Sequence, residues 1–95
     1  MNDHIVQNWK VAKPVACSRG GIVTSQNRIA SEAGARILSA GGNAVDAAVA
    51  TGFALAAVEP WNSGLGGVGF MMVYLAREKR VRVVDFGPIA PGSLD

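Results

Sequence analysis

The sequence has 95 residues, of which 49% are hydrophobic and 17% charged, and its formal net charge is +2. These values are typical of one small globular domain and exclude a disordered chain. The nine basic residues form no sustained stripe, so we do not expect nucleic-acid binding. The lone Cys17 excludes an intrachain disulfide, and residues 1–10 lack the apolar core of a secretory signal. We therefore expect a cytoplasmic protein.

The first third of the chain changes its pattern twice. Residues 1–20 show no usable period and predict an N-terminal arm. Residues 21–25 form a β-branched run between turn signals, which predicts a short strand. From Asn27 onward Ile29, Ala33 and Ile37 recur at four-residue spacing, which predicts an amphipathic surface helix. We expect this helix to end at the glycine pair 41–42, because glycine can take the left-handed conformation that closes a helix.

Residues 43–58 predict a second helix that is apolar on almost every side. Only Asp46 and Thr51 are clearly polar between Asn43 and Glu59. Asn43 is a suitable N-cap, and Asp46 three residues later can complete the capping pattern. The segment is too short for a membrane span, which needs about 20 apolar residues. We therefore expect a helix covered on most sides in a soluble protein without membrane contact, and a chain this short offers little to cover it.

The last third predicts a β-hairpin. A glycine-rich loop follows Pro60, residues 70–76 and 81–86 have strand composition, and the charged residues 77–80 predict the turn. The expected order is strand, helix, helix, strand, strand. This order is typical of an α+β fold in which helices are layered on a sheet.

The glycine-rich loop contains the letters G-x-G-x-x-G at residues 64–69. In a dinucleotide-binding motif these letters follow a strand and open a helix, whereas here they follow a helix and open a strand. We therefore expect no nucleotide cofactor. The alternative interpretation is that the glycines let the backbone turn sharply and pass close to another segment or a ligand.

No constellation of metal ligands or catalytic side chains is visible in the sequence. His4 and Cys17 are isolated, and the acidic residues lack ligand spacing, so we expect no metal site. The serines have only His4 as a conceivable base, and His4 lies in the expected arm. We therefore name no catalytic residue in this chain.

Three stretches carry a specific resemblance. They are Ala-Ser-Glu-Ala-Gly at 30–34, Gly-Gly-Asn-Ala-Val-Asp-Ala-Ala-Val at 41–49, and the segment 58–71 with Val-Glu-Pro, Ser-Gly-Leu-Gly-Gly and Gly-Phe-Met. In this order they resemble the N-terminal part of the large subunit of the γ-glutamyltransferase family. The resemblance implies an N-terminal-nucleophile hydrolase, and residues 21–95 would be a partial large-subunit domain from its four-layer αββα sandwich.

The resemblance also implies an activity and partners. Members of this family are made as a precursor that cleaves itself and exposes a threonine, which attacks γ-glutamyl amides such as glutathione. That threonine begins the small subunit, and no part of this chain resembles its surroundings. Thr24 and Thr51 fall on the expected first strand and second helix. The chain alone would be catalytically silent, and its partners would be the remainder of the large subunit, the small subunit and an acyl-amide substrate.

One departure from the family concerns the substrate pocket. Members specific for γ-glutamyl groups carry an arginine after the Asp-Phe of the second hairpin strand, where it pairs with the donor α-carboxylate. Here Gly87 and Pro88 follow Phe86. The resemblance places these three residues on the pocket wall, and the missing arginine predicts a different acyl amide.

An alternative of another class is a non-catalytic structural or interaction module derived from this family. Such a module would dock to a partner through its apolar face. A reading frame that continues to a Thr-Thr-His segment would support the enzyme, and a true stop after Asp95 would support the module.

Overall fold

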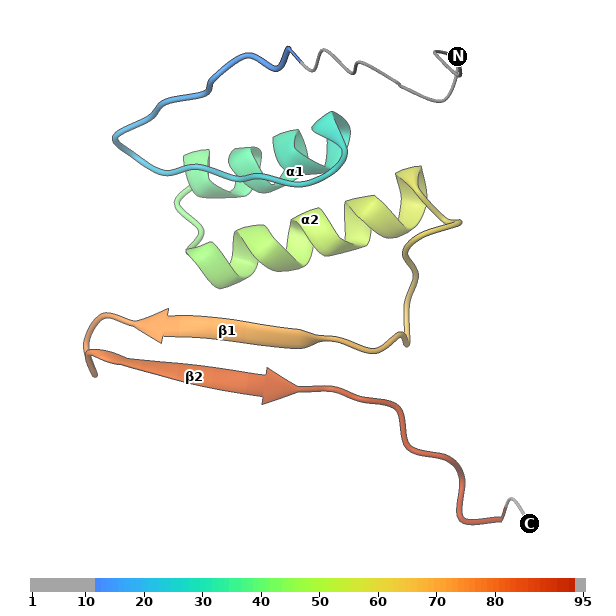
Figure 1. Cartoon of the computed structure of the whole chain (residues 1–95). Helices are drawn as coiled ribbons and strands as arrows, with labels where there is room; N and C mark the ends of the chain where they lie inside the picture. Colours follow the sequence, from blue (N-terminus) through green and yellow to red (C-terminus); the bar gives the residue numbers. More distant parts are fainter. Residues whose placement is uncertain (1–11, 94–95) are drawn as a thin grey trace, which may run out of the picture.

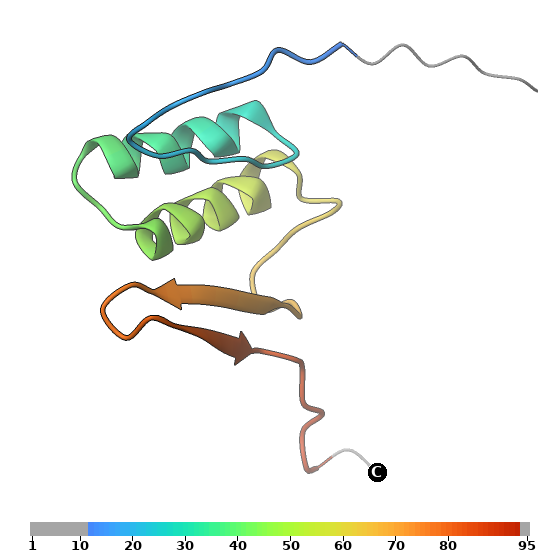
Figure 2. The ribbon, with the colours of Figure 1, turned by 60° about the vertical axis from the view of Figure 1, so that its left-hand side comes forward.

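The computed structural model describes residues 12–93. It contains two helices followed by two strands: α1 (Arg28–Ser39), α2 (Ala44–Val58), β1 (Phe70–Leu75) and β2 (Arg80–Asp85). Helix α2 lies between α1 and the β-hairpin in both ribbon views (Figures 1 and 2). The expected α+β architecture is confirmed, and the limits of the two hairpin strands differ from the expected ones by at most one residue.

Helix α1 begins at an Asn27 cap, which the structure reveals, and ends at the glycine pair that the sequence predicts. The side-chain oxygen of Asn27 accepts a hydrogen bond from the Ile29 N–H at 2.9 Å. At the other end Gly41 has a φ of +94°, and the Gly42 N–H donates to the Ile37 carbonyl oxygen at 2.9 Å. A left-handed glycine with this backward hydrogen bond is a common way to satisfy the last carbonyl groups of a helix.

Helix α2 starts with the predicted capping box. The Asn43 Oδ1 accepts from the Asp46 N–H at 2.9 Å, and the Asp46 Oδ2 accepts from the Asn43 N–H at 3.0 Å. Two backbone donors that have no partner within the helix are thereby satisfied. The first turn of α2 is therefore fixed by its own sequence.

We expect Asn43→Ala to lower the free energy of unfolding by about 1 kcal/mol, the usual cost of losing an N-cap oxygen. Asn43→Ser keeps an acceptor oxygen and should stay close to the unsubstituted chain. Urea unfolding followed by far-ultraviolet circular dichroism measures both changes. Equal losses for alanine and serine would show that the cap does not stabilise α2.

The two helices meet through small side chains. Ala30 and Ala47 are buried, and Gly34 faces Thr51 across the contact. The Thr51 hydroxyl donates to the Ala47 carbonyl oxygen at 2.8 Å, so it is satisfied within α2. Small residues let the two backbones approach closely, and this contact forms the buried centre of the described chain.

The prediction of a strand at residues 21–25 is wrong. This segment is extended and runs along the helices, but it pairs with no strand among the described residues (Figure 1). Val23 is half-buried close to Gly34, and the Ser25 hydroxyl donates to the Asn27 carbonyl oxygen at 2.7 Å. A β-branched run needs a neighbouring strand to form a ladder. Here Val23 packs on α1 instead, and Ile22 remains exposed.

The hairpin is a two-stranded antiparallel sheet with unequal faces. Met71, Val73 and Leu75 are half-buried and face α2. The other face points away from α2 and is exposed. It carries Phe70, Met72 and Tyr74 of β1 and Val81 and Val83 of β2. The side chains of one strand alternate between the two faces, so the outer face is an apolar surface without a neighbouring element among residues 12–93.

Helix α2 is less covered than its composition predicts. Phe53 remains 60% exposed and Val49 45% exposed. One side contacts α1 and another faces the hairpin, and the rest of its surface is open within residues 12–93 (Figure 2). Neither helix in the described part of the chain is long and apolar enough to cross a membrane.

Candidate functional site

The three predicted pocket residues follow the end of β2. The Phe86 N–H donates to the Gly69 carbonyl oxygen at 3.1 Å, which extends the pairing of the hairpin by one residue. The Gly87 N–H donates to the Asp85 Oδ1 at 3.0 Å. Such a hydrogen bond from a backbone N–H to an aspartate side chain two residues earlier is an Asx turn, and it bends the chain away from the strand direction.

Phe86 lines an open groove of about 610 Å³ between α2 and the glycine-rich loop. Val49, Gly52 and Phe53 form the α2 side of this groove. Residues 63–68 of the loop form the other side. The groove is mostly apolar, so it is suited to an acyl chain or to another apolar protein segment.

The structure separates the three predicted residues. Phe86 lies in the groove, whereas Gly87 and Pro88 are exposed and do not line it. The proposed contact of all three with substrate stays a prediction. The α2 side chains of the groove were missed by sequence reasoning, because a helix that is apolar on every side gives no signal for which face borders a cavity.

The glycine-rich loop contains one close approach and one special conformation. A Cβ atom at Gly69 would lie 2.5 Å from the Phe86 ring, so the close-approach interpretation is confirmed at this position. Gly66 has a φ of +75°, a left-handed conformation that favours glycine. The loop follows α2 and opens β1, so its context differs from that of a dinucleotide-binding motif, as the sequence predicts.

We expect Gly69→Ala to push the Phe86 ring out of its present rotamer, at a cost of about 0.5–1.5 kcal/mol. Gly67→Ala is the matched control, because a Cβ there meets nothing within 4 Å. Urea unfolding and the NMR shifts of the Phe86 ring protons measure the two effects. An unchanged Phe86 environment in Gly69→Ala would contradict the close contact.

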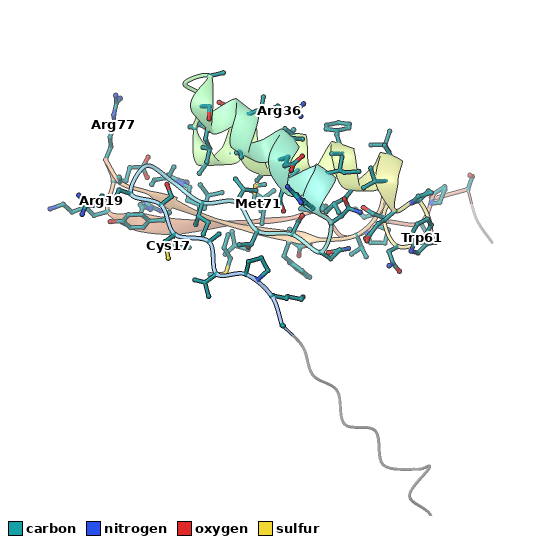
Figure 3. All side chains as sticks on the ribbon, turned by 90° about the horizontal axis from the view of Figure 1, so that it is seen from above. Cys17, Arg19, Arg36, Trp61, Met71 and Arg77 are labelled. Atoms are coloured by element: carbon teal, nitrogen blue, oxygen red, sulfur yellow. The ribbon has the colours of Figure 1, made fainter. Side chains whose placement is uncertain are left out.

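The nearby cations do not replace the missing arginine. Arg80 and Arg82 both pair with Glu78, at 3.7 and 3.1 Å. Arg82 lies opposite Val73 in the sheet register, and alternation places both arginines on the other face from Asp85. Figure 3 shows Arg77 at the turn end of the hairpin, and Trp61 at the opposite end of the molecule. The described residues therefore place no cation beside Gly87.

The described hydroxyl and acidic groups form no catalytic arrangement. The Thr51 hydroxyl is buried and bonded to the Ala47 carbonyl oxygen, so it cannot reach a substrate. His4, the one conceivable base for the serines, lies outside the described residues. Within residues 12–93 the groove thus supplies an apolar shape, and the nearest acidic group along the chain is Asp85, one residue before Phe86.

Comparison with known proteins decides the family. The model of the family described as Gamma-glutamyltranspeptidase matches residues 30–95. This chain belongs to the gamma-glutamyltranspeptidase family. The resemblance carried by the Gly-Gly-Asn-Ala-Val-Asp segment is thereby confirmed.

Relatives with two kinds of name each match this family member over 81 residues. The "Glutathione hydrolase proenzyme" of Bacillus subtilis subsp. natto is 48% identical over 81 residues, covering 85% of this chain and 14% of the relative. The "Acylase ACY 1 proenzyme" of Pseudomonas sp. strain SE83 is 50% identical over 81 residues, with the same two coverages. The chain therefore spans about 14% of the length of these curated relatives.

Two solved members of the family share the fold. The Helicobacter pylori gamma-glutamyltranspeptidase has a TM-score of 0.77 and 41% identity, and the match covers 86% of this chain and 23% of that one. The gamma-glutamyltranspeptidase from Pseudomonas nitroreducens, complexed with L-DON, has a TM-score of 0.74 and 39% identity. This match covers 83% of this chain and 23% of that one. The helices and hairpin are therefore one α+β part of the N-terminal-nucleophile hydrolase fold.

Proposed function

We propose that this gamma-glutamyltranspeptidase-family chain acts as the N-terminal part of the large subunit of an amidohydrolase or acyltransferase. The observation that carries the proposal is the 81-residue match to two proenzymes, one named as a glutathione hydrolase and one as an acylase. Its substrate would be a γ-glutamyl amide of the glutathione type or a related acyl amide. The nucleophilic threonine would come from another part of the protein.

The exposed apolar surfaces support partners from the same protein. The outer face of the hairpin and the open side of α2 both carry large apolar side chains in contact with water. Exposed apolar patches of this kind mark interaction surfaces. The remainder of the large subunit and the small subunit would cover them in the complete enzyme.

The donor class follows from position 87 in this proposal. A bidentate arginine would recognise the α-carboxylate of a γ-glutamyl donor, and glycine offers no charge there. Identity to an acylase is as high as identity to glutathione hydrolases, so the matched part is compatible with either donor. Because Gly87 offers no charge for an α-carboxylate, we favour an acyl amide other than the γ-glutamyl group.

The intact mass of the natural protein, with a γ-glutamyl-p-nitroanilide assay on the same sample, tests the proposal. We expect a precursor much larger than the 9.8 kDa of this chain, which splits into two subunits. A single species of 9.8 kDa without activity would refute the enzyme and leave the second candidate, a non-catalytic interaction module. In that case the exposed outer face of the hairpin would be the surface that binds a separate partner.

A further inference from the structure

Asp85 is the charged group beside Gly87, the residue that the proposed function places at the acyl donor. Its Oδ1 accepts the Gly87 N–H at 3.0 Å, and a Cβ atom at Gly87 would lie 3.4 Å from the same oxygen. Any group that occupies the space of a residue-87 side chain therefore lies in van der Waals contact with this carboxylate.

No cation compensates this carboxylate within residues 12–93. The ion pairs of the described chain are Arg28 with Glu32, and Glu78 with Arg80 and Arg82. Asp85 belongs to none of them, and its register partner is Phe70. The end of β2 thus carries the charge of Asp85 beside the ring of Phe86, and Gly87 adds no side chain that would cover either group.

We propose that Asp85 sets the charge preference for the acyl donor, so that amine-bearing donors are favoured over carboxylate-bearing ones. This inference rests on the proposed function and on the placement of residue 87 at the pocket wall. A carboxylate attracts an ammonium group within about 4–6 Å and repels another carboxylate at that distance. The carboxylate of Asp85 therefore takes the opposite role to the arginine that residue 87 lacks.

Three p-nitroanilides of similar size separate the charges: butyryl, 4-aminobutyryl and glutaryl. In each hydrolysis the anilide C–N bond breaks, water supplies the hydroxyl group of the released acid, and p-nitroaniline takes up a proton. On the complete natural protein we expect kcat/KM to fall in the order 4-aminobutyryl, butyryl, glutaryl. The first and last should differ by about tenfold or more at low salt, because charges are then weakly screened.

Asp85→Asn is the decisive variant. The amide keeps an oxygen that can accept the Gly87 N–H, so the turn is retained while the charge is removed. We expect the ratio of 4-aminobutyryl to glutaryl turnover to fall at least about threefold, with butyryl turnover unchanged. Glu32→Gln on α1 makes the same change in net charge far along the chain from Gly87 and should leave the ratio unaltered.

The possible outcomes distinguish a failure of the Asp85 inference from a failure of the proposed amidohydrolase function. Turnover with glutaryl preferred, or a ratio that Asp85→Asn leaves unchanged, would overturn the role of Asp85 and leave the amidohydrolase intact. An equal change in Glu32→Gln would also overturn it, because the effect would then come from net charge alone. Failure to hydrolyse any of these donors or γ-glutamyl-p-nitroanilide would overturn both proposals.

Discussion

Gly34→Ala is expected to lower the free energy of unfolding by about 1–3 kcal/mol, the usual cost of overfilling a packed contact. A Cβ at Gly34 would overlap the Thr51 hydroxyl oxygen and lie 3.0 Å from the Ala47 carbonyl oxygen. Thr51 is buried and its hydroxyl is held by Ala47, so the side chain cannot simply turn away. The helices would have to separate.

The direction of this effect is opposite to that of an ordinary helical glycine. Gly52 in α2 provides the matched control, because a Cβ there meets nothing within 4 Å. Gly52→Ala should stabilise the protein by about 0.4–1 kcal/mol by restricting the unfolded chain. Urea unfolding of both variants, followed by far-ultraviolet circular dichroism, measures the contrast. Stabilisation by both substitutions would contradict the close helix contact.

Local features of the sequence predict both helices correctly. The Asn43 cap with Asp46, the left-handed Gly41 and the spacing of Ile29, Ala33 and Ile37 all act within one or two helical turns. The hairpin is also predicted, because its strands and turn are consecutive. Contacts between residues that are close in the sequence can therefore be predicted from the local residue pattern.

The segment at 21–25 shows the limit of such reasoning. Its β-branched composition fits a strand, but a strand forms only where a neighbouring backbone offers hydrogen bonds. Here Val23 packs near Gly34, more than ten residues away, and that contact decides the outcome. The role of Gly34 itself was equally hidden, since its packing partner Thr51 comes from the second helix.

The candidate site was likewise predictable only in its local part. The glycine-rich loop was predicted to allow a close approach, but the partner, Phe86, is set by the hairpin register and not by the loop. Val49 and Phe53 border the groove because α2 presents that side to the loop. A uniformly apolar helix has no face that the sequence marks, so this part of the site becomes visible only in the fold.

Gly87→Arg in the complete natural protein is expected to raise kcat/KM for γ-glutamyl-p-nitroanilide by at least about tenfold. Deleting one partner of a buried guanidinium–carboxylate pair costs about 2–5 kcal/mol, so restoring the cation should return a part of that. Space is available, because the new Cβ meets only Asp85 Oδ1, at 3.4 Å. The same carboxylate can hold the guanidinium in place by a charge-assisted hydrogen bond.

Gly87→Met is the control, since it adds a chain of comparable length without charge. It should leave γ-glutamyl turnover near that of the unsubstituted protein, and butyryl-p-nitroanilide turnover should change little in either variant. The ratio of the two donors isolates recognition of the α-carboxylate from effects on stability. Unchanged γ-glutamyl turnover in Gly87→Arg would mean that residue 87 does not face the donor, because a guanidinium in contact with an α-carboxylate discriminates between these two substrates.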